Sequence, residues 1–257
     1  MANRFFGHQK GGGGGIRMCG RFLLTTPAEA LRQGFGFVEQ PNLAPRYNIA
    51  PTQDVPVIRQ RKNPPGERTL QMLRWGLVPS WAESLAGGAK MINARAETLT
   101  AKSAFRDAFA RRRCLVPADG FYEWQPGDKA KQPYLIAARD GAVLAFAGLW
   151  ERWTPRGGSD GPNAGGQQSG EAAPSVDSFT IVTTAANACL APLHHRMPVI
   201  VAPADYARWL DPATDPSALQ SLLRPAPDDL LHYRPVDRRV NNVRNDDAAV
   251  LRPETPA

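Results

Sequence analysis

The chain has 257 residues, of which 42% are hydrophobic and 21% charged, a balance typical of a globular protein rather than a disordered or fibrous one. Lysine and arginine number 31 against 24 acidic residues, so the net charge of +7 favours polyanionic partners. No apolar run approaches the ~20 residues that cross a bilayer, and the N-terminus carries no hydrophobic signal-peptide core. We therefore expect a cytoplasmic protein with no membrane partner.

The three cysteines, Cys19, Cys114 and Cys189, form no CxxC pair and no even-numbered set. This pattern excludes a disulfide scaffold and argues against a structural zinc site. We expect a reducing compartment, no metal ion and no organic cofactor.

The first expected elements are a strand over 19–24 and a helix whose start is marked by Thr26, Pro27 and Glu29. A threonine followed three residues later by glutamate is a capping box, and proline suits the first helical position. The remaining expected elements, in chain order, are strands at 55–61 and 69–75, a helix at 103–112, strands at 114–117, 121–124, 134–138, 143–150 and 179–184, helices at 203–210 and 216–223, and an extended segment at 231–241.

Strands outnumber helices and do not alternate with them, which predicts an α+β fold. We expect a single domain with a curved, largely antiparallel sheet or barrel-like core and flanking helices. Residues 1–17 and 154–176 lack apolar periodicity, so we interpret them as a disordered leader and a flexible loop insertion. The expected domain spans 18–251, and 252–257 form a polar tail.

Four polar residues stand out in segments that otherwise look structural: Cys19, Asn93, Glu123 and His194. Each has an ordinary interpretation, respectively a small buried thiol, a turn residue, a solvent-facing strand carboxylate and a solvated imidazole beside an arginine. No phosphate-binding glycine loop and no HExxH motif accompanies them. Taken singly, none of the four establishes a function.

Together, six motifs in order resemble the SOS-response-associated peptidase (SRAP) family, whose members shield abasic sites in single-stranded DNA. The matching segments are Met18–Arg21, Arg46–Thr52, Trp75–Pro79, Ile92–Thr98, Pro117–Trp124 and His194–Pro198. The resemblance covers nearly the whole chain from Met18 to about Leu251.

The resemblance implies covalent chemistry at a cysteine exposed at the mature N-terminus. Its α-amine attacks the aldehyde of an opened abasic sugar to form a Schiff base, and its thiol then closes a thiazolidine ring. An α-amine titrates near ~7.7–8 and a thiol near ~8.5, so reactive forms of both exist at neutral pH. Because one residue carries both groups, ring closure is intramolecular.

The resemblance also implies a role for each site residue. Asn93 orients the cysteine, Glu123 acts as acid or base, and His194 transfers a proton to the imine. The aromatic residues around Glu123 favour a raised pKa through desolvation. Thr183 aligns with a family residue near the site and is expected to contribute to DNA binding.

Binding of the DNA strand is implied for a further set of motif residues, which comprises Arg21, Arg46, Asn48, Arg95 and Arg196 as phosphate contacts and Trp75 and Trp81 as stacking residues. Core packing is the alternative role for either tryptophan. The triplet Arg111–Arg113 resembles a DNA-binding patch, but we favour a solvated helix end, where cations suit the helix dipole. No element that reads bases is apparent, so we expect salt-dependent binding without sequence preference.

The sequence departs from the family at its start, because seventeen residues precede Met18. With Cys19 internal, the thiazolidine chemistry is impossible. Met18 is the true start, or the leader is cleaved after Met18, or the extension is retained and the protein binds DNA without crosslinking. We favour the first explanation.

Two other functions compete with abasic-site capture: a cysteine N-terminal amide hydrolase or autopeptidase, and a non-catalytic binder of single-stranded DNA. Lyase cleavage at the abasic site is an expected side activity. We expect a monomer that meets abasic single-stranded DNA, replication-fork proteins as further partners and, in a bacterium, association with the nucleoid.

Overall fold

The computed structural model describes residues 20–125, 131–155 and 174–254. Its strands are β1 (Phe22–Leu24), β2 (Arg46–Ile49), β3 (Asp54–Gln60), β4 (Arg68–Trp75), β5 (Asn93–Arg95), β6 (Arg113–Ala118), β7 (Gly120–Gln125), β8 (Gln132–Ala138), β9 (Leu144–Trp153), β10 (Val176–Ala185), β11 (Arg196–Pro198) and β12 (Leu231–Pro235). Its α-helices are α1 (Ala28–Phe35), α2 (Ser103–Arg111) and α3 (Tyr206–Leu210). Its 3-10 helices are η1 (Leu85–Lys90), η2 (Ala96–Thr98), η3 (Pro203–Asp205), η4 (Pro216–Leu222), η5 (Arg238–Asn241) and η6 (Ala248–Leu251).

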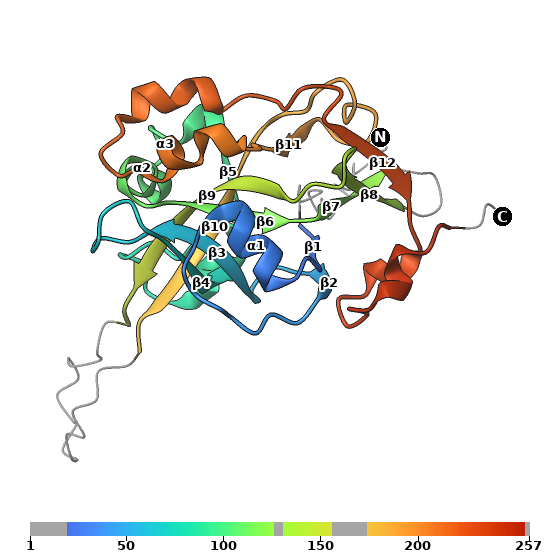
Figure 1. Ribbon diagram of the computed structural model, residues 1–257, viewed down its shortest axis with the longest axis horizontal. Helices are drawn as coiled ribbons and strands as arrows, with labels where there is room; N and C mark the ends of the chain where they lie inside the picture. Colours follow the sequence, from blue (N-terminus) through green and yellow to red (C-terminus); the bar gives the residue numbers. More distant parts are fainter. Residues whose placement is uncertain (1–19, 126–130, 156–173, 255–257) are drawn as a thin grey trace, which may run out of the picture.

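The strands form two sheets (Figure 1). One has the order β12-β8-β7-β1-β2, and the other has the order β11-β10-β4-β3-β6-β9, with β5 also on β10. Because β9 pairs with β10 as well as β6, the strands β10, β4, β3, β6 and β9 close into a barrel. The pairings of β10 with β4 and β5 are parallel and the other named pairings are antiparallel. The expected α+β fold with a largely antiparallel, barrel-like core is confirmed.

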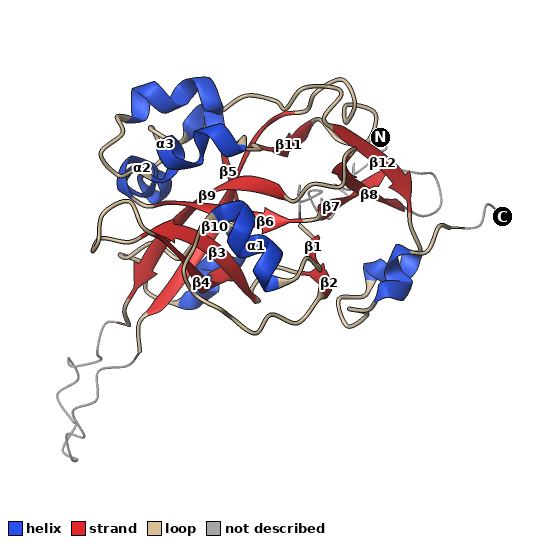
Figure 2. Ribbon diagram, in the orientation of Figure 1, coloured by secondary structure: helices blue, strands red, loops and turns tan. Residues whose placement is uncertain are grey.

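An aromatic cluster fills the space between the sheets. Phe22 of β1 contacts Trp75 and Phe146 edge to face, with ring centroids 5.1 and 6.2 Å apart, and Phe121 meets Phe146 in the same way. Tyr122, the next residue on β7, points instead into a smaller cluster with Leu23, as strand alternation requires. The helices lie outside the sheets (Figure 2), and α2 and α3 lie at the end of the molecule away from β12 (Figure 1).

Most expected elements are present, with shifted ends. Strands β2, β5 and β11 were not expected, and the segment expected over 216–223 is a 3-10 helix. The extended segment expected to reach 241 ends at Pro235, because the Asp237 carboxylate accepts the Arg239 N–H at 2.8 Å and starts η5. The expected leader and most of the 154–176 insertion lie outside the described residues. No helix of the described chain is long and apolar enough to span a bilayer.

The start of α1 differs from the expected capping box. Glu29 pairs with Arg32, and no side chain of the helix caps its first turn. Instead, the Asp119 carboxylate, between β6 and β7, accepts bonds from the backbone N–H and hydroxyl groups of Thr25 and Thr26 at 2.6–2.9 Å. A tertiary contact therefore fixes the turn between β1 and α1.

Replacing Asp119 with alanine is expected to lower the free energy of unfolding by about 2–4 kcal/mol, because four donors lose one charged acceptor. Urea unfolding measures the change. Asp229→Ala, at an exposed position, is the control and should change stability by less than about 0.5 kcal/mol. Equal stability of the two variants would contradict the anchoring role of Asp119.

Candidate functional site

The described chain begins beside Glu123. Phe22 pairs with Phe121 and Leu23 with Gly120, and the Tyr122 N–H donates to the Arg21 carbonyl at 3.0 Å. Extended two residues beyond the Phe22–Phe121 pair, this antiparallel register would align Gly20 with Glu123. The Glu123 side chain is 3% exposed and, by alternation, shares the face of Phe121 between the sheets.

Asn93 approaches the same region from the barrel. It opens β5, pairs with Ile181 of β10, and follows Ile92, whose carbonyl accepts the Trp75 indole N–H at 3.0 Å. Because the Trp75 ring also packs against Phe22, one indole joins the start of β1 to the start of β5. The structure thus brings the Asn93 segment and the Gly20–Arg21 segment to one aromatic cluster.

Thr183, Arg95 and Arg196 lie together on β5, β10 and β11. Thr183 is fully buried and pairs with Arg95 of β5, and Arg196 pairs with Ala185. The Arg196 guanidinium binds both carboxylate oxygens of Glu97 at 2.6 and 2.9 Å and donates to the Thr183 carbonyl at 2.6 Å. Only 10% of the Arg196 side chain is exposed. Thr183 therefore positions Arg196, and its side chain is not accessible to DNA.

His194 precedes β11 and is 8% exposed. Its Nδ1 accepts the backbone N–H of Arg196 at 3.1 Å, so the neutral ring assigned from this bond carries its proton on Nε2. Burial, and secondarily the nearby His195 and Arg196, lower the pKa of His194 below its ordinary value. At neutral pH the ring is uncharged, and Nε2–H is its remaining donor.

Three residues expected to contact DNA serve the interior instead. Asn48 is fully buried, and its amide donates to the carbonyls of Val240, Asn242 and Asn245 at 2.9–3.1 Å. Arg21 donates to the Asn48 amide oxygen and the Val240 carbonyl, both at 2.8 Å.

The third is Trp75, which is 0% exposed and has its N–H occupied. A DNA base could reach Trp75 or Asn48 only if the core opened. The expectation that these two side chains contact DNA is therefore corrected, and Arg21 is held mainly by the protein itself.

Other expected contact residues remain at the surface. Trp81 is 54% exposed, on a loop fixed where the Trp153 N–H donates to the Ala82 carbonyl at 2.7 Å. Arg95 is exposed and makes no hydrogen bond or ion pair with its side chain in the described chain. Arg46 is partly exposed but pairs with Asp246 and donates to Gln53 at 2.7 Å.

Sequence reasoning missed Glu97 and the C-terminal segment 240–246. Glu97 lies within the motif Ile92–Thr98, four residues after Asn93. Its negative charge could have indicated a partner for Arg196. The segment 240–246 was interpreted as an extended strand end and its polar continuation, although its run of Asn and Asp residues is typical of turns with side-chain caps. Cys19 lies outside the described residues, so the structure gives no geometry for it.

Comparison with known proteins identifies the relatives of this chain. A model of the family described as SOS response associated peptidase (SRAP) matches residues 18–243. The abasic site processing protein YoqW of Bacillus subtilis is 38% identical over 240 residues, covering 91% of this chain and 99% of YoqW. The abasic site processing protein HMCES of Gallus gallus is 31% identical over 278 residues, covering 92% of this chain and 78% of HMCES.

Solved structures agree in fold. A protein from Bacteroides thetaiotaomicron has a TM-score of 0.76 at 24% identity, covering 92% of this chain and all (100%) of its own. A protein from Bordetella bronchiseptica has a TM-score of 0.68 at 29% identity, covering 85% of this chain and 100% of its own. On the family match and these identities, the chain belongs to the SOS response associated peptidase (SRAP) family.

Proposed function

We propose that this protein captures abasic sites in single-stranded DNA through a covalent bond to Cys19. The observation that carries the proposal is that Phe22 of β1 pairs with β7, the strand that contains Glu123, and packs against Trp75, whose indole N–H donates to the residue before Asn93. Gly20 is the residue bonded to Cys19, so the chain leads from the proposed nucleophile directly to these side chains. The names of relatives such as YoqW and HMCES support the same substrate.

The proposed reaction requires the form of the protein that begins at Cys19. The α-amine adds to the C1′ aldehyde of the opened sugar and releases one water as the imine forms. The thiol sulfur then adds to the imine carbon and its proton passes to nitrogen, which closes the thiazolidine without a further leaving group. Both reacting groups belong to one residue, so ring closure avoids the entropic cost of a second encounter.

The proposal divides the proton transfers between two buried residues, Glu123 and His194. We assign Glu123 to proton transfer in sugar opening and imine formation, and its raised pKa stays a prediction. We assign His194 to the imine, where its Nε2–H is a donor. Asn93 is assigned to orienting the amine, because an amide offers both a donor and an acceptor without competing as a nucleophile.

The DNA strand is proposed to lie across β5 and the Trp81 loop. Arg95 offers an exposed guanidinium for a phosphate, and Trp81 offers an exposed ring for a base. Arg196 contributes its charge while held by Glu97. These contacts involve the backbone and stacking, so the proposed binding tolerates any sequence.

Two finer activities are proposed for the same residues. Lyase cleavage of the strand would proceed from the imine, and autopeptidase action would hydrolyse the Met18–Cys19 amide with one water. The proposed setting is a monomer in the cytoplasm, and contact with replication-fork proteins stays a prediction.

The protein beginning at Met18, mixed with an oligonucleotide that carries one abasic site, is expected to give a heat-stable adduct. Its mass should equal Cys19–Ala257 plus the oligonucleotide, less one water. Intact-mass spectrometry detects it. Cys19→Ser keeps the amine but cannot close the thiazolidine, whereas Cys189→Ser, at a free cysteine elsewhere, should react normally. No adduct from the unaltered protein would refute covalent capture.

Glu123→Gln is expected to slow adduct formation by about 100-fold, because an amide cannot transfer the proton. Binding of undamaged single-stranded DNA should stay unchanged, since the shape of this buried side chain is preserved. Single-turnover rates and fluorescence anisotropy measure the two quantities. Glu83→Gln, at an exposed position, is the matched control. Equal loss of rate and of binding in Glu123→Gln would show that Glu123 is structural.

The lowered pKa of His194 makes folding stability depend on pH. Below the ordinary histidine pKa of 6.5 the unfolded chain binds the proton more readily than the folded chain, so stability falls as pH falls. In His194→Asn, urea unfolding between pH 7.5 and 5.5 should show a weaker dependence. His195→Asn should largely keep it, because burial remains the main cause. The same slope in all three proteins would contradict a depressed pKa.

A further inference from the structure

A second cationic surface lies at the other end of β10 from Thr183. Asp177, near the start of the strand, binds Arg59 at 3.2 Å and Arg152 at 2.7 and 2.9 Å. Thr183, near its end, accepts from Arg196. Six residues of a strand separate the two positions by about 20 Å. The surface around Asp177 is therefore distinct from the candidate site.

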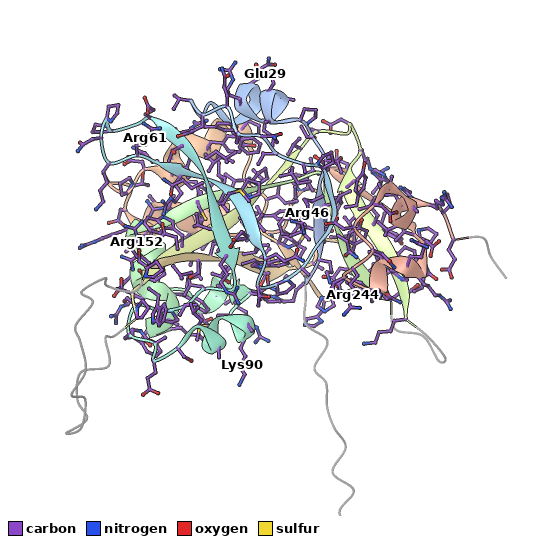
Figure 3. The ribbon with its side chains drawn as sticks, turned by 90° about the horizontal axis from the view of Figure 1, so that it is seen from below. Glu29, Arg46, Arg61, Lys90, Arg152 and Arg244 are labelled. Atoms are coloured by element: carbon purple, nitrogen blue, oxygen red, sulfur yellow. The ribbon has the colours of Figure 1, made fainter. Side chains whose placement is uncertain are left out.

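The surface contains a cleft of about 790 Å³, whose lining includes Arg59, Arg61, Lys62, Arg112, Trp150 and Arg152. A second hollow of about 680 Å³ shares Arg61, Lys62, Arg112 and Trp150 and continues to Arg111. Figure 3 places Arg61 and Arg152 at one end of the molecule and Arg46 and Arg244 toward the other. We call the two connected hollows the distal cleft.

The arginine triplet that ends α2 contributes to this cleft unevenly. Arg113, expected to be solvated, is 2% exposed and donates to the carbonyls of Phe109 and Ala110 at 2.6 and 2.7 Å, which closes the helix end. Arg112 pairs with Glu151 at 2.6 Å. Arg111 is exposed and makes no ion pair within the described chain. Only Arg111 matches the expected solvated helix end.

Acidic side chains neutralise only part of the cleft. Glu39 binds Arg61 at 2.6 Å and Glu151 binds Arg112, while Asp177 serves both Arg59 and Arg152. Lys62, like Arg111, is exposed and has no ion pair within the described chain. These two cations are the uncompensated charges at the rim, where a phosphate would gain most.

Trp150 gives the cleft an aromatic wall. Its ring is partly exposed, and the Arg59 guanidinium lies 3.9 Å from its centroid. The Arg59 side chain is 8% exposed and is held by Asp177, so the stacked pair is fixed in place. A rigid planar surface beside unpaired cations suits a base and its phosphate, which is the chemistry of a nucleotide unit.

We propose that the distal cleft binds a nucleotide unit of single-stranded DNA, with phosphates at Lys62 and Arg111 and a base near Trp150. The cleft gives a DNA strand a second contact, distant from the candidate site at which abasic capture is proposed. The inference rests on the proposed capture only for its biological setting. At 3.4 Å per nucleotide, about six nucleotides are needed to cover even the ~20 Å of β10 from Asp177 to Thr183. Strands much shorter than this cannot occupy both.

The test compares binding of undamaged, fluorescein-labelled oligonucleotides of about four and about 20 nucleotides, below and above this span. The double variant Lys62→Glu/Arg111→Glu is expected to bind the longer strand about tenfold more weakly, with a salt slope reduced by about 1.4 for two lost phosphate contacts. Affinity for the shorter strand, which can occupy only one of the two positions at a time, should fall less. Arg139→Glu/Arg224→Glu makes the same charge change at exposed positions without ion pairs in the described chain.

Three results would overturn the inference. The first is that the two double variants weaken DNA binding equally. The second is that the cleft variant loses the same factor of affinity for short and for long strands. The third is micromolar binding of a free deoxynucleotide that the cleft variant abolishes, without any dependence of DNA affinity on strand length. The adduct assay on the shorter abasic strand separates this inference from covalent capture. A cleft variant that forms adduct normally but binds long strands weakly supports the cleft, and absence of adduct in every protein refutes only the capture.

Discussion

The short strand β1 is the constraint on which the rest of the structure depends. Its first residue, Phe22, is fully buried and meets Trp75 and Phe146 edge to face. Each such aromatic pair contributes about 0.5–1.5 kcal/mol beyond the burial of area. The backbone of β1 also joins β2 to β7. Both sheets are therefore fixed relative to the residue that follows Cys19, and Asp119 holds the other end of the strand through Thr25 and Thr26.

The first described residues are also held by the C-terminal segment. Arg21 and Asn48 together bind the carbonyls of Val240, Asn242 and Asn245, and the Asp246 carboxylate accepts the Asn48 N–H at 2.8 Å. A buried amide that loses its hydrogen-bond partners lowers the free energy of unfolding by about 1–3 kcal/mol, so we expect these hydrogen bonds to form and break together. Polar motif residues such as Arg21 and Asn48 thus position the backbone that leads to the proposed nucleophile, without themselves facing a ligand.

The long strands and the α+β class follow from local patterns, since alternation over six or more residues has a clear period. Strands of three or four residues, such as β2, β5 and β11, have no such period and depend on neighbours far along the chain. The predicted capping box of α1 was wrong for the same reason, because Asp119, far along the chain, accepts the Thr26 N–H in place of the local Glu29. For the site, the motif resemblance proposed the candidate residues, but only burial separates Trp75 from Trp81 and Asn48 from Arg95.

The charge pattern of the molecule gives the two DNA contacts proposed for it different roles. At the candidate site, Arg196 is paired with Glu97 and mostly buried, so its guanidinium is held in one orientation, which suits the positioning of a reacting sugar. At the distal cleft, Lys62 and Arg111 are exposed and unpaired in the described chain, which suits loose, salt-dependent attraction of a strand. A strand held at the cleft raises the effective concentration of its neighbouring nucleotides at the candidate site without any new contact there. Asp177 and Thr183, which hold arginines at the two positions, both belong to β10. The spacing is therefore set by the barrel rather than by a linker, so the gain depends on strand length and not on strand sequence.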